Sequence, residues 1–129
     1  MTTSRTTGME GAPRPDVSLG KSRRLTATKD FAETYAQGRS LAGRYMVLWV
    51  RTGGGASLRL GVVASRVIGD AVRRNRAKRR LREAWRLNRH CWSAPVDVVL
   101  VARRSILGAA WEDVVAELVR LARKAGLDR

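Results

Sequence analysis

The segment that most constrains the fold is DAVRRNRAKRRLREAWRLNR, which runs from Asp70 to Arg89. Asp70 follows a glycine and has a side chain suited to an N-cap, so we expect a helix to begin there. Apolar residues recur at the i, i+4, i+7 and i+8 positions of this helix and form one stripe that a sheet can bury. The members of the stripe are Ala77, Leu81, Ala84 and Trp85. The opposite side carries Arg76, Arg79, Arg80, Arg82 and Arg86.

The same helix carries nine Lys and Arg residues and a single acid, Glu83. A helix face that merely meets solvent gains from alternating charges, whereas this one places like charges beside each other. The whole chain of 129 residues has a formal net charge of +15, from 26 Lys and Arg against 11 Asp and Glu. Such a charge on a small domain predicts a polyanionic partner, which leaves RNA, DNA or an anionic membrane surface.

The chain before this helix predicts one further helix and two strands. The first element is a helix from Thr28 to Gly38, in which Thr28 or Asp30 can act as the cap and Asp30 with Glu33 has capping-box spacing. Runs rich in β-branched and aromatic residues at 45–51 and 58–65 are joined by three glycines, which predicts a β-hairpin. Gly61 inside the second run indicates a bulge or a close backbone approach.

After the basic helix, residues 96–102 form a nearly continuous apolar run, as in an interior strand. The last element, 111–124, is an amphipathic helix that packs on the core through Trp111, Val114, Val115, Leu118, Val119 and Ala122. Its outer face is expected to carry Glu112, Asp113, Glu117, Arg120 and Arg123.

This αββαβα order predicts an α/β (α+β) fold, a two-layer sandwich with a mixed sheet of about four strands and three helices. The strand, basic helix and strand can form a parallel unit, for which general physics favours a right-handed crossover. Residues 1–24 have few large apolar side chains and predict a disordered basic tail, and residues 25–129 a single RNA-binding domain.

Few residues of the chain are suited to catalysis. One cysteine, Cys91, and one histidine, His90, exclude an internal disulfide framework and a Cys/His zinc cage, and we expect a reducing cytoplasm. The acids are not spaced as two-metal nucleolytic sites require. No long apolar run or signal-peptide core indicates a membrane. We therefore expect a binding protein with no catalytic and no metal-binding residues of its own.

Residues 61–83 resemble the signature of the protein subunit of bacterial ribonuclease P. That family has a strand with a serine and a basic residue, here Ser65 and Arg66, then Ile/Val-Gly-Asn-Ala-Val and an Arg-Asn-Arg helix, here residues 74–76. Leu25, residues 30–40 and residues 96–103 extend the resemblance, which spans about 25–125. Two departures lower the positive charge near the helix start: Asp70 stands where the family usually has Asn, and Val67 where it often has Lys.

The resemblance implies that a catalytic RNA subunit hydrolyses precursor tRNA with Mg²⁺ and frees the 5′ leader, while the polypeptide itself binds no cofactor. The residues implied in binding the RNA subunit are Arg73, Arg74, Asn75, Arg76, Lys78, Arg79 and Arg82. Those implied in binding the leader, in a cleft between the sheet and the first helix, are Phe31, Tyr35, Trp49, Ser65 and Arg66. The family also implies a left-handed crossover around the basic helix.

Other interpretations remain open from the residues alone. A ribosomal protein shares the charge and the sandwich, and a DNA-binding protein can place the arginine helix in a major groove. A membrane-surface protein fits least, because the apolar stripe of the basic helix is needed by the sheet. Phe31 and Tyr35, four residues apart, can equally form a core-facing pair. The expected partners are thus the catalytic RNA and precursor tRNA, with no membrane and no obligate protein partner.

Overall fold

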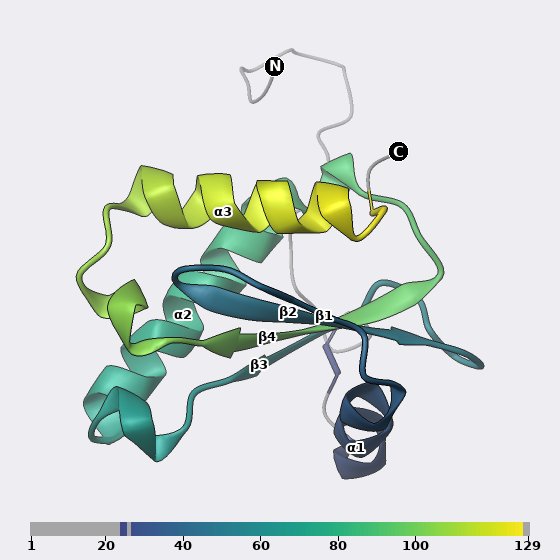
Figure 1. The fold of residues 1–129 in the computed structure, drawn as a ribbon, viewed down its shortest axis with the longest axis horizontal. Coiled ribbons are helices and arrows are strands. Elements are labelled where there is room, and N and C mark those ends of the chain that lie inside the picture. The colour runs from purple at the N-terminus through teal and green to yellow at the C-terminus, as the bar shows by residue number, and fades with distance from the viewer. Residues whose placement is uncertain (1–23, 26, 128–129) are drawn as a thin grey trace, which may run out of the picture.

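The computed structural model describes Arg24, Leu25 and residues 27–127. Three helices and a four-stranded mixed sheet make up the fold, which confirms the expected α/β class (Figure 1). In chain order the elements are α1 (Thr28–Gln37), β1 (Ser40–Ala42), β2 (Met46–Thr52), β3 (Leu60–Val63), α2 (Ala71–Asn88), β4 (Val96–Ala102) and α3 (Trp111–Lys124). Short 3₁₀ turns lie at Arg66–Ile68, Arg89–Cys91 and Arg104–Leu107.

The hydrophobic core lies between one face of the sheet and the layer formed by α2 and α3. Side chains alternate between the two faces of a strand, and alternate residues of β2 and β4 point into this core: Met46, Leu48, Val50, Val98, Leu100 and Ala102. The predicted stripe of α2 is fully buried there, with 0% exposure at Ala77, Leu81, Ala84 and Trp85. Helix α1 lies alone on the opposite face, near one end of the sheet (Figure 1).

The predicted hairpin between β2 and β3 is wrong. The strand order is β1-β2-β4-β3, so β4 lies between the two strands that the glycines connect. β4 pairs antiparallel with β2 and parallel with β3, because its apolar run is suited to burial on both faces and thus to the centre of the sheet. β3 is also shorter than expected: Leu58 has a φ of 62°, which is incompatible with a strand at that point.

The edge strand β1 was not predicted, since its three residues are too few to give a pattern. The parallel pairing of β3 and β4 confirms the predicted strand–helix–strand unit, and the hand of its crossover stays a prediction. α3 has the predicted bounds, and Asp70 caps α2 by accepting a hydrogen bond from the backbone N–H of Arg73.

Helix α1 begins at Thr28 as predicted, and Gly38 ends it as expected, with a φ of 70°, but the predicted cap is wrong. Its N-cap is Ala27, and neither Thr28 nor Asp30 caps it. Asp30 lies in the first turn, where its carboxylate faces Arg51 of β2 and Arg59, the residue before β3. The predicted tail, residues 1–24, lies outside the described residues except for Arg24, which forms an isolated parallel bridge with Leu60. In the described part of the chain, no helix is long and apolar enough to cross a membrane.

Candidate nucleic-acid interface

The face of the sheet that carries α1 gathers three of the five residues predicted to bind a leader. The strand registers place Trp49 of β2, Val99 of β4 and Gly61 of β3 in one row across the sheet. The Phe31 ring lies directly on Gly61, where an added Cβ would lie 2.5 Å from the ring's Cζ atom. The close backbone approach expected at Gly61 is that of the Leu25 carbonyl oxygen, 3.4 Å from the same Cβ, and the Phe31 side chain comes closer still.

The other two aromatic rings contact each other beside Phe31. Tyr35 meets Trp49 edge to face, with ring centroids 5.0 Å apart and an interplanar angle of 86°. Tyr35 remains 39% exposed, and its partial burial raises the pKa of its hydroxyl. Phe31 and Trp49 are half-buried. The alternative of a core-facing pair is wrong, because neither Phe31 nor Tyr35 belongs to the buried core cluster.

Ser65 and Arg66 lie at the other end of this face. Both are exposed and follow the end of β3. Ser65 is four residues beyond Gly61, or about 13 Å along an extended chain, so the structure does not bring it against the aromatic rings. Between the two ends, Val47, Val101 and Val63 form the next row of the same face, and all three are half-buried. The five predicted residues therefore mark the two ends of one surface with an apolar floor.

The exposed side of α2 carries the residues predicted to bind an RNA subunit. Arg73, Asn75, Arg76, Arg79 and Arg82 are exposed, and Arg74 and Lys78 are half-buried. Arg73 pairs with Asp70 at 3.3 Å, and Arg74 donates to the carbonyl of Gly69. Within the described residues, no acid pairs with Arg76, Lys78, Arg79 or Arg82. This side of the helix thus presents uncompensated positive charge to solvent.

Two arginines expected on that exposed side have structural partners instead. Arg80 is half-buried and donates to the backbone carbonyls of Ile106 and Ala109, with its guanidinium 5.9 Å from the Trp111 ring centroid. Arg86 pairs with Glu83 at 2.8 Å, and its hydrogen bond lowers the pKa of that carboxyl. The positions of these arginines at the flanks of the buried stripe bring them within reach of neighbouring groups.

The α1 face and the basic side of α2 meet at the edge of β3. A surface pocket of about 260 Å³ there is lined by Arg24, Leu25, Phe31, Leu60, Gly61, Val62 and Arg82. Phe31 comes from the predicted leader set and Arg82 from the predicted RNA-subunit set. The structure therefore makes one continuous surface of two sets of residues that are far apart in sequence.

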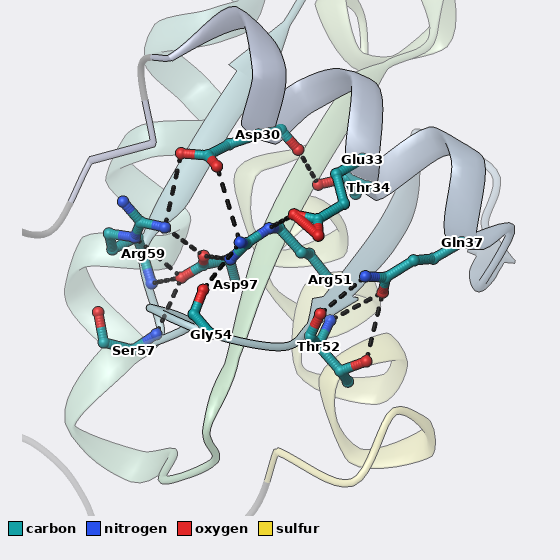
Figure 2. Close-up of polar contacts among 10 residues, drawn as sticks. All are labelled: Asp30, Glu33, Thr34, Gln37, Arg51, Thr52, Gly54, Ser57, Arg59 and Asp97. Carbon is teal, nitrogen blue, oxygen red and sulfur yellow. Dashed lines mark hydrogen bonds and ion pairs between the residues drawn. The ribbon is translucent and has the colours of Figure 1, made fainter.

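A buried carboxylate on the central strand organises the polar contacts beneath α1 (Figure 2). Asp97 is 0% exposed and accepts five hydrogen bonds, from the side chains of Arg51 and Arg59 and from the backbone N–H groups of Ser57 and Arg59. Burial alone raises the pKa of Asp97, but the hydrogen bonds from Arg59 and from the two backbone groups outweigh it and hold the pKa below its ordinary value. A buried charge with this many donors is well compensated.

The sequence alone did not predict this arrangement, and the only signal was one acid, Asp97, within an otherwise apolar strand. It also misplaced Glu117, which was expected on the outer face of α3. Glu117 is 4% exposed, and its carboxylate accepts hydrogen bonds from the backbone N–H groups of Arg44, Tyr45 and Met46. It therefore secures the turn between β1 and β2 from the core side.

The structure gathers no conventional hydrolytic centre among the described residues. His90 and Cys91 lie together in the 3₁₀ turn after α2, and Cys91 is exposed. No group of three His, Cys, Asp or Glu residues in this part of the chain is arranged to hold a metal ion. What the described surface offers is positive charge, partly exposed aromatic rings and half-buried valines, a combination suited to a single-stranded polyanion.

A family model described as Ribonuclease P matches residues 19–126 of the chain. The ribonuclease P protein component of Pelotomaculum thermopropionicum is 35% identical over 105 residues, which cover 81% of this chain and 94% of that protein. The corresponding protein of Symbiobacterium thermophilum is 40% identical over 110 residues, covering 84% and 96%.

Solved structures agree with these sequence matches. The RNase P protein of Staphylococcus aureus superposes with a TM-score of 0.73 at 26% identity, covering 84% of this chain and 100% of the other. The RNase P protein of Thermotoga maritima gives a TM-score of 0.68 at 32% identity, covering 78% and 96%. The similarity thus extends over the strands, α2 and the helix that carries the aromatic residues.

Proposed function

We propose how this chain works as a member of the ribonuclease P protein family, to which it belongs and whose members are subunits of ribonuclease P. In that enzyme it binds the catalytic RNA through α2 and the 5′ leader of precursor tRNA through the α1 face. In this proposal the RNA subunit hydrolyses the phosphodiester bond. The polypeptide alone is inactive, and it improves the affinity of the enzyme for the precursor.

One observation carries the proposal: the uncompensated cations on the exposed side of α2. Within the described residues, Arg76, Lys78, Arg79 and Arg82 have no acidic partner, although other arginines of the same helix do. Mutual repulsion among these side chains destabilises the free protein. RNA phosphates relieve this repulsion when the side chains neutralise them and the counterions of the RNA are released. We therefore assign RNA-subunit binding to Arg73, Arg74, Asn75, Arg76, Lys78, Arg79 and Arg82.

The leader is assigned to the α1 face because of its rings and its floor. Unpaired bases stack on aromatic side chains without a sequence code, which suits leaders of varied sequence. Phe31, Tyr35 and Trp49 supply rings at one end, while Ser65 and Arg66 supply a hydroxyl and a charge for phosphates at the other. The half-buried valines between them offer an apolar surface to riboses and bases.

The Mg²⁺ that the reaction requires is assigned to the RNA subunit. The carboxylates gathered most closely beneath α1, those of Asp30, Glu33 and Asp97, face Arg51 and Arg59 rather than an open position. They do not fit a metal ion, which would have to displace arginines that already neutralise them. We further propose that the enzyme works in the cytoplasm, with no membrane and no obligate protein partner.

Reconstitution tests the division of labour. We expect purified protein alone to leave precursor tRNA intact, and protein with its cognate RNA subunit and Mg²⁺ to release the leader and a mature 5′ end. Denaturing gels of end-labelled precursor measure both reactions. Cleavage by RNA-free protein that survives removal of contaminating nucleases would contradict the proposal, as would co-purification with ribosomal RNA in place of the RNA subunit.

A further inference from the structure

Several polar contacts attach helix α1 to the sheet. No residue of α1 belongs to the buried apolar cluster, and its two buried residues, Asp30 and Thr34, are polar. Its aromatic side chains contact the sheet at its surface, Phe31 on Gly61 and Tyr35 against Trp49. Something other than the hydrophobic core must therefore fix the place of this helix.

Five charged residues, Asp30, Glu33, Arg51, Arg59 and Asp97, fasten the first half of α1, and we name them the α1 clamp (Figure 2). All three donor nitrogens of the Arg51 guanidinium are used. Its Nε donates to Glu33 at 2.7 Å, its Nη1 to Asp97 at 2.8 Å and its Nη2 to the carbonyl of Gly54 at 2.9 Å. Arg51 is only 5% exposed, so its planar side chain has one available orientation.

Asp97 fixes the second arginine of the clamp in the same way. Arg59 donates to both oxygens of Asp97, from Nε at 3.2 Å and from Nη2 at 2.7 Å. Both arginines then face the carboxylate of Asp30 in α1, each at 3.7 Å. The buried carboxylate of Asp97 therefore orients the two guanidinium groups, and these in turn hold Asp30 and with it the first turn of α1.

The C-terminal end of α1 has a separate attachment. The Gln37 side chain donates to the carbonyl of Thr52 at 2.7 Å and accepts from its backbone N–H at 2.8 Å and from its hydroxyl at 3.3 Å. Gln37 lies outside the clamp and carries no charge. The two attachments lie at opposite ends of the helix segment that carries Phe31 and Tyr35.

We propose that the α1 clamp, together with Gln37, sets the position at which α1 holds Phe31 and Tyr35 over the sheet, which makes Asp97 a positioning residue for the leader. Asp97 itself touches no RNA, since it is fully buried beneath the arginines. This inference rests on the proposed leader contact and adds the residues that give that contact its geometry. Small displacements of a binding group cause large losses, so rigid attachment of α1 has a functional purpose.

The chain offers a matched control on the other face of the sheet. Glu117 is also a buried carboxylate with several hydrogen bonds, but its partners are backbone N–H groups of residues 44–46 and the side chain of Arg120. Replacing it removes a comparable buried charge without touching the α1 clamp. Any general loss of stability should therefore appear in both Asp97→Asn and Glu117→Gln.

The test compares Asp97→Asn, Gln37→Ala and Glu117→Gln in enzyme assembled with its cognate RNA subunit. We measure the affinities for precursor tRNA and for mature tRNA, which has no leader, and amide hydrogen exchange in the free proteins. Asp97→Asn and Gln37→Ala should each lower the precursor-to-mature preference by about threefold or more, because the rings are mispositioned. Exchange should quicken in α1 but not in α3, and Glu117→Gln should keep the preference of the unaltered protein.

Separate results overturn the inference and the proposed function. If Phe31→Leu lowers the preference while Gln37→Ala and Asp97→Asn keep it, the clamp does not position the leader. An equal loss in Glu117→Gln would likewise reduce the effect to general stability and overturn the inference. If Phe31→Leu itself keeps the preference, the proposed leader contact fails and the inference fails with it. Should Asp97→Asn not fold, Glu33→Gln takes its place, because Glu33 is an exposed residue of the clamp that accepts from Arg51; a Glu33→Gln protein that keeps the preference would then overturn the inference.

Discussion

The Phe31 ring occupies the space that a side chain at position 61 would need, so its position requires a glycine there. The ring lies so close to the strand that a Cβ at position 61 would come within 2.5 Å of the Phe31 Cζ atom and within 2.7 Å of its Cε1 atom. The absence of a side chain at position 61 therefore lets the Phe31 ring pack directly on the strand. The ring also lines the pocket that Arg82 lines. The position of Phe31 is thus set by a residue that has no side chain.

Replacement of Phe31 by leucine separates leader binding from assembly. Leucine keeps much of the apolar volume but removes the flat face, so the affinity for precursor tRNA should fall by about 1 kcal/mol or more, or roughly fivefold. Affinity for mature tRNA and for the RNA subunit should barely change. Binding of both tRNAs to the assembled enzyme, measured side by side, gives the answer.

Arg76→Ala is the control for that experiment and should show the opposite pattern. Its exposed side chain has no acidic partner among the described residues, so its loss should weaken assembly with the RNA subunit first. Circular dichroism checks that both variants are folded. A Phe31→Leu protein that binds both tRNAs equally weakly would indicate that the leader lies elsewhere.

Asp97 predicts a defined response to acid. Its pKa is held below the ordinary value of 3.8, so its contribution to stability is present above that value and is lost as the pH falls through the lower, folded-state pKa. The free energy of unfolding should therefore drop below about pH 4 more steeply in the unaltered protein than in Asp97→Asn. Urea unfolding across that range measures the difference. Parallel curves for the two proteins would contradict the assigned charge state.

At the scale of elements, α2 concentrates the expected RNA contacts on one side. If Arg76, Arg79 and Arg82 each neutralise a phosphate, their joint replacement by alanine should reduce the slope of log affinity against log salt. The reduction should be about one unit or less for each contact. Filter binding to the RNA subunit over a range of salt concentrations measures that slope. An unchanged slope in the triple variant would place the RNA site on another element.

The elements themselves could be predicted because their signals are local. Asp70, the stripe from Ala77 to Trp85 and the apolar run of β4 each act within a few residues, and the structure has them as expected. Pairing is not local, and the glycines after β2 suggested a hairpin although β4 is the strand that pairs with β2. Burial of charge is not local either, since Asp97 lies 46 residues from Arg51 and Glu117 lies 71 residues from Met46.

The candidate site divides in the same way. The basic side of α2 follows from helical periodicity, which is why Arg76, Arg79 and Arg82 are exposed as expected. Periodicity did not reveal that Arg80 and Arg86 have partners, because those partners depend on how neighbouring side chains pack. The joining of Phe31 and Arg82 in one pocket depends on the order of strands, which no short segment of sequence contains.

For the molecule as a whole, a net charge of +15 predicts that anions stabilise the fold. Self-repulsion destabilises the free protein, and an ion that binds only the folded state raises its stability by mass action. Sulfate or phosphate should therefore raise the melting temperature more than chloride does at matched ionic strength. Differential scanning calorimetry measures the shift, with sucrose as an uncharged control. Equal melting temperatures in the three salts would argue against preformed anion sites.

The position of β4 in the middle of the sheet has a consequence for how the chain folds during synthesis. Ribosomes deliver the chain from its N-terminus, so β2 and β3 are made well before the strand that joins them. The register pairs Met46 with Ala102, and β2 and β3 cannot be joined in one sheet until that late strand is made. Until then the apolar stripe of α2 cannot be buried against the complete sheet, and the arginines of α2 leave the ribosome before β4 does.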